Sequence, residues 1–207
     1  MTRPTVRVVA TDVRGQRGDL AGLSALIRQA APDVAVITGT PWRLRTRPRA
    51  ADLASRSGLF AAAGNASTLG NVILVSLRVD VHDTWCVQFP LVPGDRLCGA
   101  VLARCSVGSD TFVVAGTRLS ASAPDRARQA GILTRVLSEV DEPVVLAGDL
   151  ADTELAHDRI EAVAGGVFVG PGVGVAARHY ARRGRATAPV MVDLLLPAGA
   201  VAGTPAT

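Results

Sequence analysis

The sequence has 207 residues, and its 22 basic and 18 acidic side chains leave a formal net charge of +4. All of the basic residues are arginines, so neither a Schiff-base lysine nor the lysine of a phosphate-binding P-loop is available. Hydrophobic residues make up 48% of the chain and charged residues 19%, which excludes a disordered protein. Aromatic residues make up only 3%, too few for a platform on which single-stranded nucleic acid stacks.

The first part of the chain alternates short apolar runs with amphipathic stretches. The elements that this pattern predicts are, in order, a strand at 6–10, a helix from 20 that Asp19 caps and Pro32 ends, a buried strand at 34–37, a basic loop at 41–49 and a short helix near 50–57. A strand is also predicted at 72–77, with a weaker strand at 79–87 paired to it.

The second part predicts more strands than helices. After a turn near 90–94, the predicted elements are a strand at 97–105, a hairpin turn at 108–110, a strand at 112–115, a helix that Ser122 caps, a buried strand at 143–147, a short helix near 153–163 and a final strand at 190–196. Some strands are joined by tight turns and others by helices, which favours a mixed α/β or α+β domain. We expect one domain over residues 1–200 and a flexible tail over 201–207.

Targeting and membrane signals are not visible in the sequence. There is no signal-peptide pattern and no apolar span near 20 residues, so we expect a cytoplasmic protein with no membrane partner. The three cysteines, Cys86, Cys98 and Cys105, show no metal-binding spacing, and we expect them to be small buried hydrophobic residues.

Three aspartates lie in apolar strands or directly after them: Asp12, Asp149 and Asp193. An unpaired carboxylate is costly in such a place, and carboxylates from separate strands commonly meet over a cation. Mg²⁺ or Mn²⁺ fits this pattern, because one or two carboxylates with water and a phosphate suffice to hold such an ion. The alternative is that each aspartate caps a helix or closes a turn, which is common for this residue type.

The order of these segments resembles the endonuclease/exonuclease/phosphatase superfamily of Mg²⁺-dependent phosphoesterases over nearly the whole chain. The matching segments are 8–15 for the opening strand, 32–39 for the strand that ends in the metal-binding Glu, 70–76 for the next strand, 114–120 where the family has Thr-His-Leu, Arg126 and Gln129 on the helix that follows, 144–151 for Gly-Asp-x-Asn, and 192–194 for the closing Asp-His. The resemblance implies a four-layer α/β/β/α sandwich, in which two packed mixed β-sheets are flanked by helices. It also implies in-line attack of water on phosphorus, with Asp149 orienting or deprotonating that water.

Several positions depart from the family pattern. The replacements are Gly39 for the metal-binding Glu, Ala151 for the Asn of Gly-Asp-x-Asn, Arg118 for the His of Thr-His-Leu, Leu194 for the final His and Asp12 for the first Asn. Loss of one catalytic group costs about 10²–10⁴-fold in rate, so ordinary family catalysis is not expected. The remaining candidates are Asp149 and Asp193 as catalytic residues, and Asp12 and Asp193 as ligands of Mg²⁺ or Mn²⁺.

Two loops are rich in arginine: Arg43, Arg45, Arg47 and Arg49 in one, and Arg178, Arg182, Arg183 and Arg185 in the other. In the family topology both loops rim the site that contains Asp12 and Asp149. Guanidinium groups bind phosphate bidentately and need no metal to do so. The candidate ligand-binding residues are Arg118, Arg43, Arg45, Arg182 and Arg183; the alternative is that the loops are solvated parts of an arginine-rich chain.

Three functions remain open. The main prediction is a phosphoesterase scaffold whose catalysis is weak or lost and which binds a phosphate-containing ligand or nucleic acid, because Gly39, Ala151 and Leu194 stand where the family has functional groups. The alternative is an active Mg²⁺- or Mn²⁺-dependent phosphodiesterase or nuclease that uses Asp12, Asp149 and Asp193. The third is a structural or interaction protein whose cleft is vestigial.

Overall fold

The computed structural model describes residues 5–13, 20–40, 46–64, 68–91, 97–149, 161–163, 167–169, 174–179 and 190–195. Its helices are α1 (Leu20–Ala30), α2 (Thr46–Ser57) and α3 (Ala123–Ser138). Its strands are β1 (Thr5–Asp12), β2 (Val34–Thr38), β3 (Phe60–Ala63), β4 (Val72–Val75), β5 (Asp80–Gln88), β6 (Gly99–Val107), β7 (Asp110–Arg118), β8 (Val144–Asp149), β9 (Glu161–Val163), β10 (Val167–Val169), β11 (Gly174–His179) and β12 (Val190–Leu195).

The strands form two mixed sheets of six strands each. The first sheet has the order β11-β12-β1-β2-β4-β3 and the second has the order β5-β6-β7-β8-β10-β9. One pair in each sheet is parallel, namely β1 with β2 and β7 with β8. A parallel pair needs a crossover connection, which α1 provides in the first sheet and α3 in the second. Each sheet therefore has a β-α-β unit at its centre.

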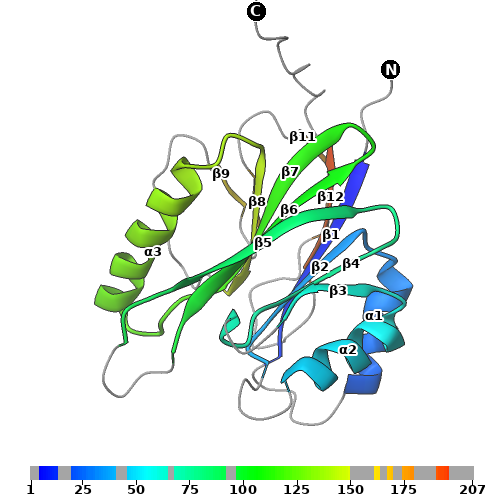
Figure 1. Ribbon diagram of the computed structural model, residues 1–207, viewed down its shortest axis with the longest axis horizontal. Helices are drawn as coiled ribbons and strands as arrows, with labels where there is room; N and C mark the ends of the chain where they lie inside the picture. Colours follow the sequence, from blue (N-terminus) through cyan, green and yellow to red (C-terminus); the bar gives the residue numbers. More distant parts are fainter. Residues whose placement is uncertain are drawn as a thin grey trace, which may run out of the picture.

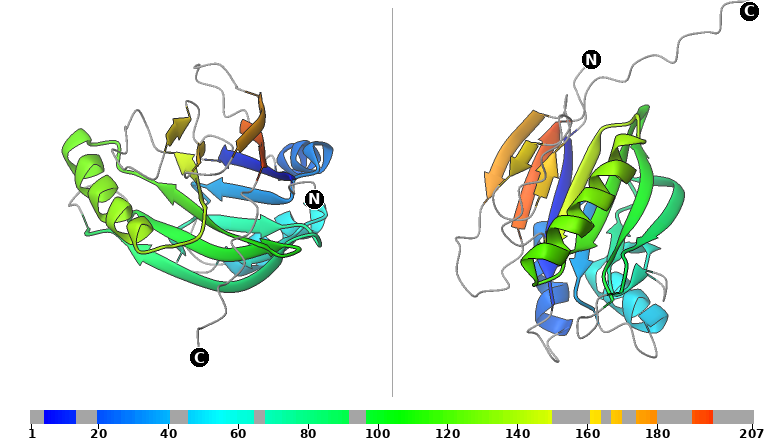
Figure 2. Two further views of the ribbon diagram at one scale, coloured as in Figure 1. Left: turned by 90° about the horizontal axis from the view of Figure 1, so that it is seen from above. Right: turned by 90° about the vertical axis from the view of Figure 1, so that its left-hand side faces the viewer.

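The sheets and the helices that cover them can be followed in Figures 1 and 2. Three buried apolar clusters hold these layers together. The cluster between the sheets contains alternate residues of both, including Val36 and Val145. Ile27 of α1 and Leu53 of α2 pack on the outer face of the first sheet, and Leu133 of α3 packs on the outer face of the second. This arrangement confirms the predicted four-layer sandwich. Within the described residues, no helix is long and apolar enough to span a membrane.

Some elements differ from the sequence predictions. The predicted pairing of 79–87 with 72–77 is wrong, because β5 pairs with β6 in the second sheet while β4 lies between β2 and β3 in the first. The predicted helix near 153–163 is wrong over 161–163, which forms β9 next to β10; residues 150–160 lie outside the described residues. The first error concerns tertiary pairing, because local apolar patterns do not indicate which sheet a strand joins, and the second concerns the type of the element.

Smaller differences concern a helix cap and a thiol. Ser122 occupies the N-cap position of α3, but its side chain makes no capping hydrogen bond. Cys98 and Cys105 are buried as expected, whereas Cys86 is exposed on β5. Burial raises the pKa of the Cys105 thiol to about 12, which makes this thiol unreactive at neutral pH.

The two sheets approach each other tightly where β7 crosses β2. A Cβ atom on Gly116 would lie 2.8 Å from Cγ1 of Val36 and 3.3 Å from Cγ1 of Val101. Both valines are fully buried, so neither has free space into which it can move. The absence of a side chain at Gly116 therefore allows β7 to pack directly on β2.

We expect Gly116→Ala to destabilise the protein by about 1–3 kcal/mol, because the added methyl group would overpack the space between the sheets. Gly131→Ala is the matched control: a Cβ at Gly131, on an exposed part of α3, meets nothing within 4 Å. This control should stabilise the protein by about 0.5–1 kcal/mol, because alanine is the better helix former. Urea denaturation measures both changes, and equal midpoints for the two variants would contradict the tight approach.

Candidate functional site

The carboxyl ends of the two parallel strand pairs lie at the same end of the sandwich. In the first sheet Asp12 pairs with Thr38, and in the second Arg118 pairs with Asp149. Contact between Val36 and Gly116, two residues before Thr38 and Arg118, joins the two pairs across the sandwich. Four polar residues from four strands therefore gather where the apolar core ends.

Strand alternation makes these four side chains face the space between the sheets. Side chains two residues apart in a strand point to the same face. Ala10 of β1 and Val36 of β2 belong to the cluster between the sheets, and so do Val114 of β7 and Ala147 of β8. Continuing each alternation by two or four residues places Asp12, Thr38, Arg118 and Asp149 on the inner faces.

Asn71, the residue directly before β4, joins these residues, and we call the five residues Asp12, Thr38, Asn71, Arg118 and Asp149 the carboxyl-end cluster. Asn71 is 1% exposed, and its Nδ2 donates to the carbonyl oxygens of Thr68 and Gly99, each at 3.0 Å. Thr117 Oγ1 donates to the same Gly99 oxygen at 2.9 Å. The Gly99 carbonyl, at the start of β6, thus links the ends of the two sheets.

Thr38 and Asn71 are members of this cluster that the sequence pattern does not single out. Thr38 is fully buried, and among the described residues neither its Oγ1 nor Asn71 Oδ1 has a hydrogen-bond partner. Both residues are polar positions at the ends of apolar runs, the same signal that identified Asp12 and Asp149. A hydroxyl or an amide group is a weaker hydrogen-bonding group than a carboxylate, so these two positions are less conspicuous in the sequence than Asp12 and Asp149.

Asp149 owes its position to the glycine before it. Gly148 has a φ of +140°, and a Cβ atom there would lie 1.9 Å from the carbonyl oxygen of Thr117. Any residue with a Cβ atom would clash with β7 here, so glycine is required directly before Asp149. The backbone is secured further by the Leu119 N–H, which donates to the Asp149 carbonyl at 3.0 Å.

Arg118 faces Asp149 at close range. Its Nε lies 3.8 Å from Asp149 Oδ2, within ion-pair range but beyond a hydrogen bond, and both side chains are 19% exposed. The fold places a permanent positive charge beside the carboxylate that the family resemblance identifies with the water-activating group.

The segment after Arg118 is held by the start of α3. Gln129 Oε1 accepts a hydrogen bond from the Ser120 N–H at 2.8 Å, and Gln129 is 3% exposed. Arg126 Nη1 donates to the carbonyl oxygens of Ser120 at 3.2 Å and Ala121 at 3.0 Å. The two residues that resemble the family's helix motif therefore anchor the backbone next to the carboxyl-end cluster.

Asp193 does not join this cluster. It pairs with Arg7 in the β1–β12 register, five residues from Asp12, a separation of about 17 Å along the strand. Its neighbour Leu194 faces the space between the sheets, so Asp193 faces the opposite side of the first sheet. This placement does not fit the expected metal site of Asp12 and Asp193 or a catalytic role for Asp193 beside Asp149.

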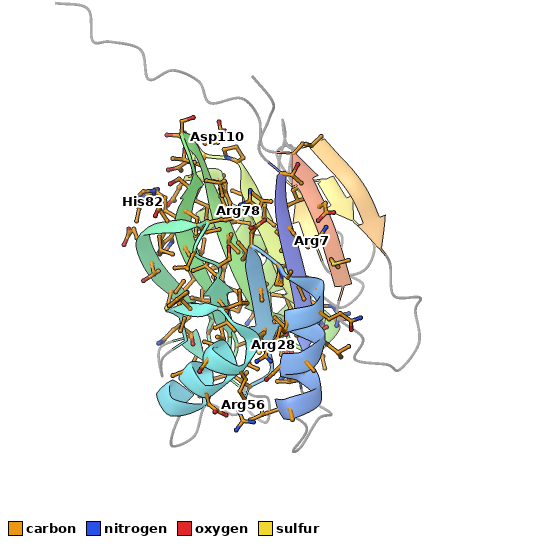
Figure 3. The ribbon with its side chains drawn as sticks, turned by 90° about the vertical axis from the view of Figure 1, so that its right-hand side faces the viewer. Arg7, Arg28, Arg56, Arg78, His82 and Asp110 are labelled. Carbon is orange, nitrogen blue, oxygen red and sulfur yellow. The ribbon has the colours of Figure 1, made fainter. Side chains whose placement is uncertain are left out.

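A structural partner explains the acid in this strand. Arg7, which is labelled in Figure 3, donates through Nε to Asp193 Oδ1 at 2.6 Å and through Nη2 to Oδ2 at 3.0 Å. This hydrogen bonding and the charge of Asp193 raise the pKa of Arg7 above its usual value. Arg7 Nη1 also donates to the carbonyl oxygen of Ala30 at 3.2 Å, which ties the end of α1 to this pair.

Comparison with known proteins relates this arrangement to solved structures. No family model and no curated protein matches the sequence. The human Nocturnin catalytic domain with bound sulfate matches with a TM-score of 0.70 at 13% identity, covering 94% of this chain and 95% of that chain. An endonuclease/exonuclease/phosphatase from Beutenbergia cavernae matches with a TM-score of 0.70 at 22% identity, covering 94% of this chain and 72% of that chain. D. rerio TDP2 complexed with a single-strand DNA product matches with a TM-score of 0.70 at 12% identity, covering 92% of this chain and 98% of that chain.

This chain has the endonuclease/exonuclease/phosphatase fold. The predicted resemblance is confirmed at the level of the fold, over nearly the whole chain. The family resemblance implies a Mg²⁺ ion at the carboxyl-end cluster.

The described residues do not fit a resident metal ion of the family type. Gly39 has no side chain to offer, Asp193 lies on the other face with Arg7, and Asp149 is in ion-pair range of Arg118. No group of three or more His, Cys, Asp or Glu side chains that could hold a metal occurs among the described residues. Asp12 is the candidate ligand that keeps its expected place.

One of the five candidate ligand-binding arginines lies in the part of the chain that the structure describes. Arg43, Arg45, Arg182 and Arg183 lie outside the described residues. Arg118 is thus the member of the predicted arginine set that the structure brings to the carboxyl-end cluster.

We expect Asp193→Asn to destabilise the fold by about 1 kcal/mol, because it removes the charge from a bidentate and partly exposed ion pair. Asp52→Asn is the matched control, since Asp52 pairs with Arg56 on the exposed surface of α2 at 2.9 Å. This control should change stability by at most a few tenths of a kcal/mol. Thermal unfolding measures both, and an Asp193→Asn variant as stable as the control would argue against the structural role.

Proposed function

We propose that this chain is a phosphoesterase-fold domain that binds a phosphate-containing ligand at the carboxyl-end cluster and has lost efficient hydrolysis. The observation that carries the proposal is the Arg118–Asp149 pair, in which a guanidinium group stands beside the expected water-activating carboxylate. Family catalysis needs a metal ligand set and a histidine in this region, and the chain has Gly39 and Arg118 at those positions.

Binding is supported by the chemistry of the arginine side chain. A guanidinium group offers a planar set of N–H donors that matches phosphate oxygens, and its charge persists at every physiological pH. The sulfate bound by Nocturnin and the DNA product bound by TDP2 are anions held by proteins of the same fold. The class of ligand proposed for this chain, a phosphate-containing small molecule or a nucleic acid, follows from these two arguments.

One observation favours the second candidate function, a working Mg²⁺- or Mn²⁺-dependent phosphodiesterase or nuclease. Asp12 and Asp149 lie on inner faces at the same end of the sandwich, and two carboxylates with a substrate phosphate can hold a divalent ion. In this candidate the ion arrives with the substrate, and Asp193 takes no part in the chemistry.

We expect no divalent-dependent cleavage above buffer when the protein is screened with Mg²⁺ or Mn²⁺ against plasmid DNA, single-stranded DNA, inositol phosphates and a simple diester. Labelled duplex DNA should bind in fluorescence anisotropy, with affinity falling steeply between about 50 and 200 mM salt because counterions are released. Arg118→Ala should weaken binding about tenfold or more, because a charge-assisted bidentate contact is lost.

The control for this variant is Arg104→Ala. Arg104 pairs with Glu142 at 2.6 Å, near the amino end of β8 and away from the carboxyl-end cluster, so its loss should leave binding nearly unchanged. Cleavage that disappears in Asp149→Asn would overturn the proposal in favour of the active enzyme. If neither cleavage nor binding is seen, the site is vestigial and both candidate functions fail.

A further inference from the structure

We propose that Asp149 is an internal competitor for Arg118, which a ligand phosphate must displace before it can bind. This inference rests on the proposed function and deepens it, because it names the residue that sets the affinity of the site. It also gives Asp149 a role unlike that of a catalytic base: the carboxylate occupies the place of an anion.

The geometry of the pair supports a displaceable contact. Asp149 Oδ2 is 3.8 Å from Arg118 Nε, which attracts the guanidinium without a hydrogen bond between these two atoms. A phosphate oxygen at ordinary hydrogen-bonding distance would be about 1 Å closer and would gain a charge-assisted hydrogen bond. Both side chains are 19% exposed, so a ligand arriving from solvent can reach the exposed part of the guanidinium group, whereas Arg118 Nε itself is buried.

The backbone keeps the carboxylate from moving away with its strand. The parallel register pairs Arg118 with Asp149, and the Leu119 N–H holds the Asp149 carbonyl at 3.0 Å. Gly148 has no room for displacement towards β7, because Thr117 already fills the space that a Cβ would need. The backbone of Asp149 therefore stays in place, and a ligand displaces the carboxylate by rotation of the Asp149 side chain alone.

Charge balance strengthens the competition. Asp12 faces the same space from β1, so among the described residues of the carboxyl-end cluster two carboxylates accompany one guanidinium. An approaching phosphate meets more negative than positive charge from these groups, and removing the carboxylate nearest the guanidinium should favour it most. The anion that gains is one that can place an oxygen at hydrogen-bonding distance from Arg118, as a phosphate can.

The Asp149→Asn variant tests the proposed competition, because it keeps the shape of the side chain and removes its charge. Binding of inorganic phosphate, measured by calorimetry, and of labelled duplex DNA, measured by anisotropy, should tighten roughly five- to twentyfold. Glu142→Gln is the matched control: it removes the same charge from an ion pair with Arg104, near the amino end of β8. It should change affinity less than about twofold, since its charge is distant from the cluster.

A double-mutant cycle separates competition from general repulsion. If Asp149 acts through Arg118, the gain from Asp149→Asn should disappear in an Arg118→Ala background. A gain of equal size in that background would overturn the inference and indicate simple repulsion of the ligand by Asp149. Unchanged or weaker binding in Asp149→Asn, with thermal unfolding like that of the parent protein, would also overturn it.

The Asp149→Ala variant is a second test if the asparagine amide adds a hydrogen bond to the ligand, and it should show a gain in the same direction. The proposed function fails separately: the parent chain would then bind neither probe, or Arg118→Ala would bind as well as the parent. Phosphate binding that depends on Arg118 but is insensitive to Asp149 would retain the function and remove the competitor.

Discussion

The packing of β2 against β7, through Val36 and Gly116, is the contact on which the arrangement of this molecule depends. It brings together two parallel strand pairs that belong to different sheets and are built by separate crossover helices. Because each pair ends two residues beyond this contact, the contact determines which polar residues meet. A side chain at Gly116 would separate the sheets at the place where the site begins.

The opposite end of the sandwich has a different construction. Asp33 is 5% exposed; its Oδ2 accepts from the Arg7 N–H at 2.8 Å and its Oδ1 from Arg78 Nη1 at 2.9 Å. The Arg7 side chain extends from there to Asp193. These charges link β1, β2, β12 and the turn after β4, so the acids at this end are structural. Strand alternation therefore places Asp12 and Asp193 on opposite faces of the first sheet.

The chemistry at the carboxyl-end cluster follows from what arginine can and cannot do. A histidine exchanges a proton near neutral pH, whereas a guanidinium group stays charged and can only attract and orient an anion. With Arg118 beside Asp149, the cluster holds a fixed positive charge next to a carboxylate, and Gly39 follows β2 without a side chain. The proposed binding of phosphate depends on this guanidinium group, which cannot exchange a proton at neutral pH.

The sequence by itself determined the class of the fold and the positions of most central strands and helices, because alternation and helical spacing are local properties of the chain. It also identified Asp12 and Asp149, since a charged residue at the end of an apolar strand is visible in one dimension, and it identified Arg118 through its position in the family motif. It could not place β5 in the second sheet, because a strand's pattern does not identify its neighbour. It also could not separate Asp193 from Asp12: both end or interrupt apolar runs, and only the β1–β12 register and the side of the sheet distinguish them. The tertiary structure alone decided that Asp193 pairs with Arg7 and that Thr38 and Asn71 join the cluster, because side-chain direction depends on which strands lie side by side.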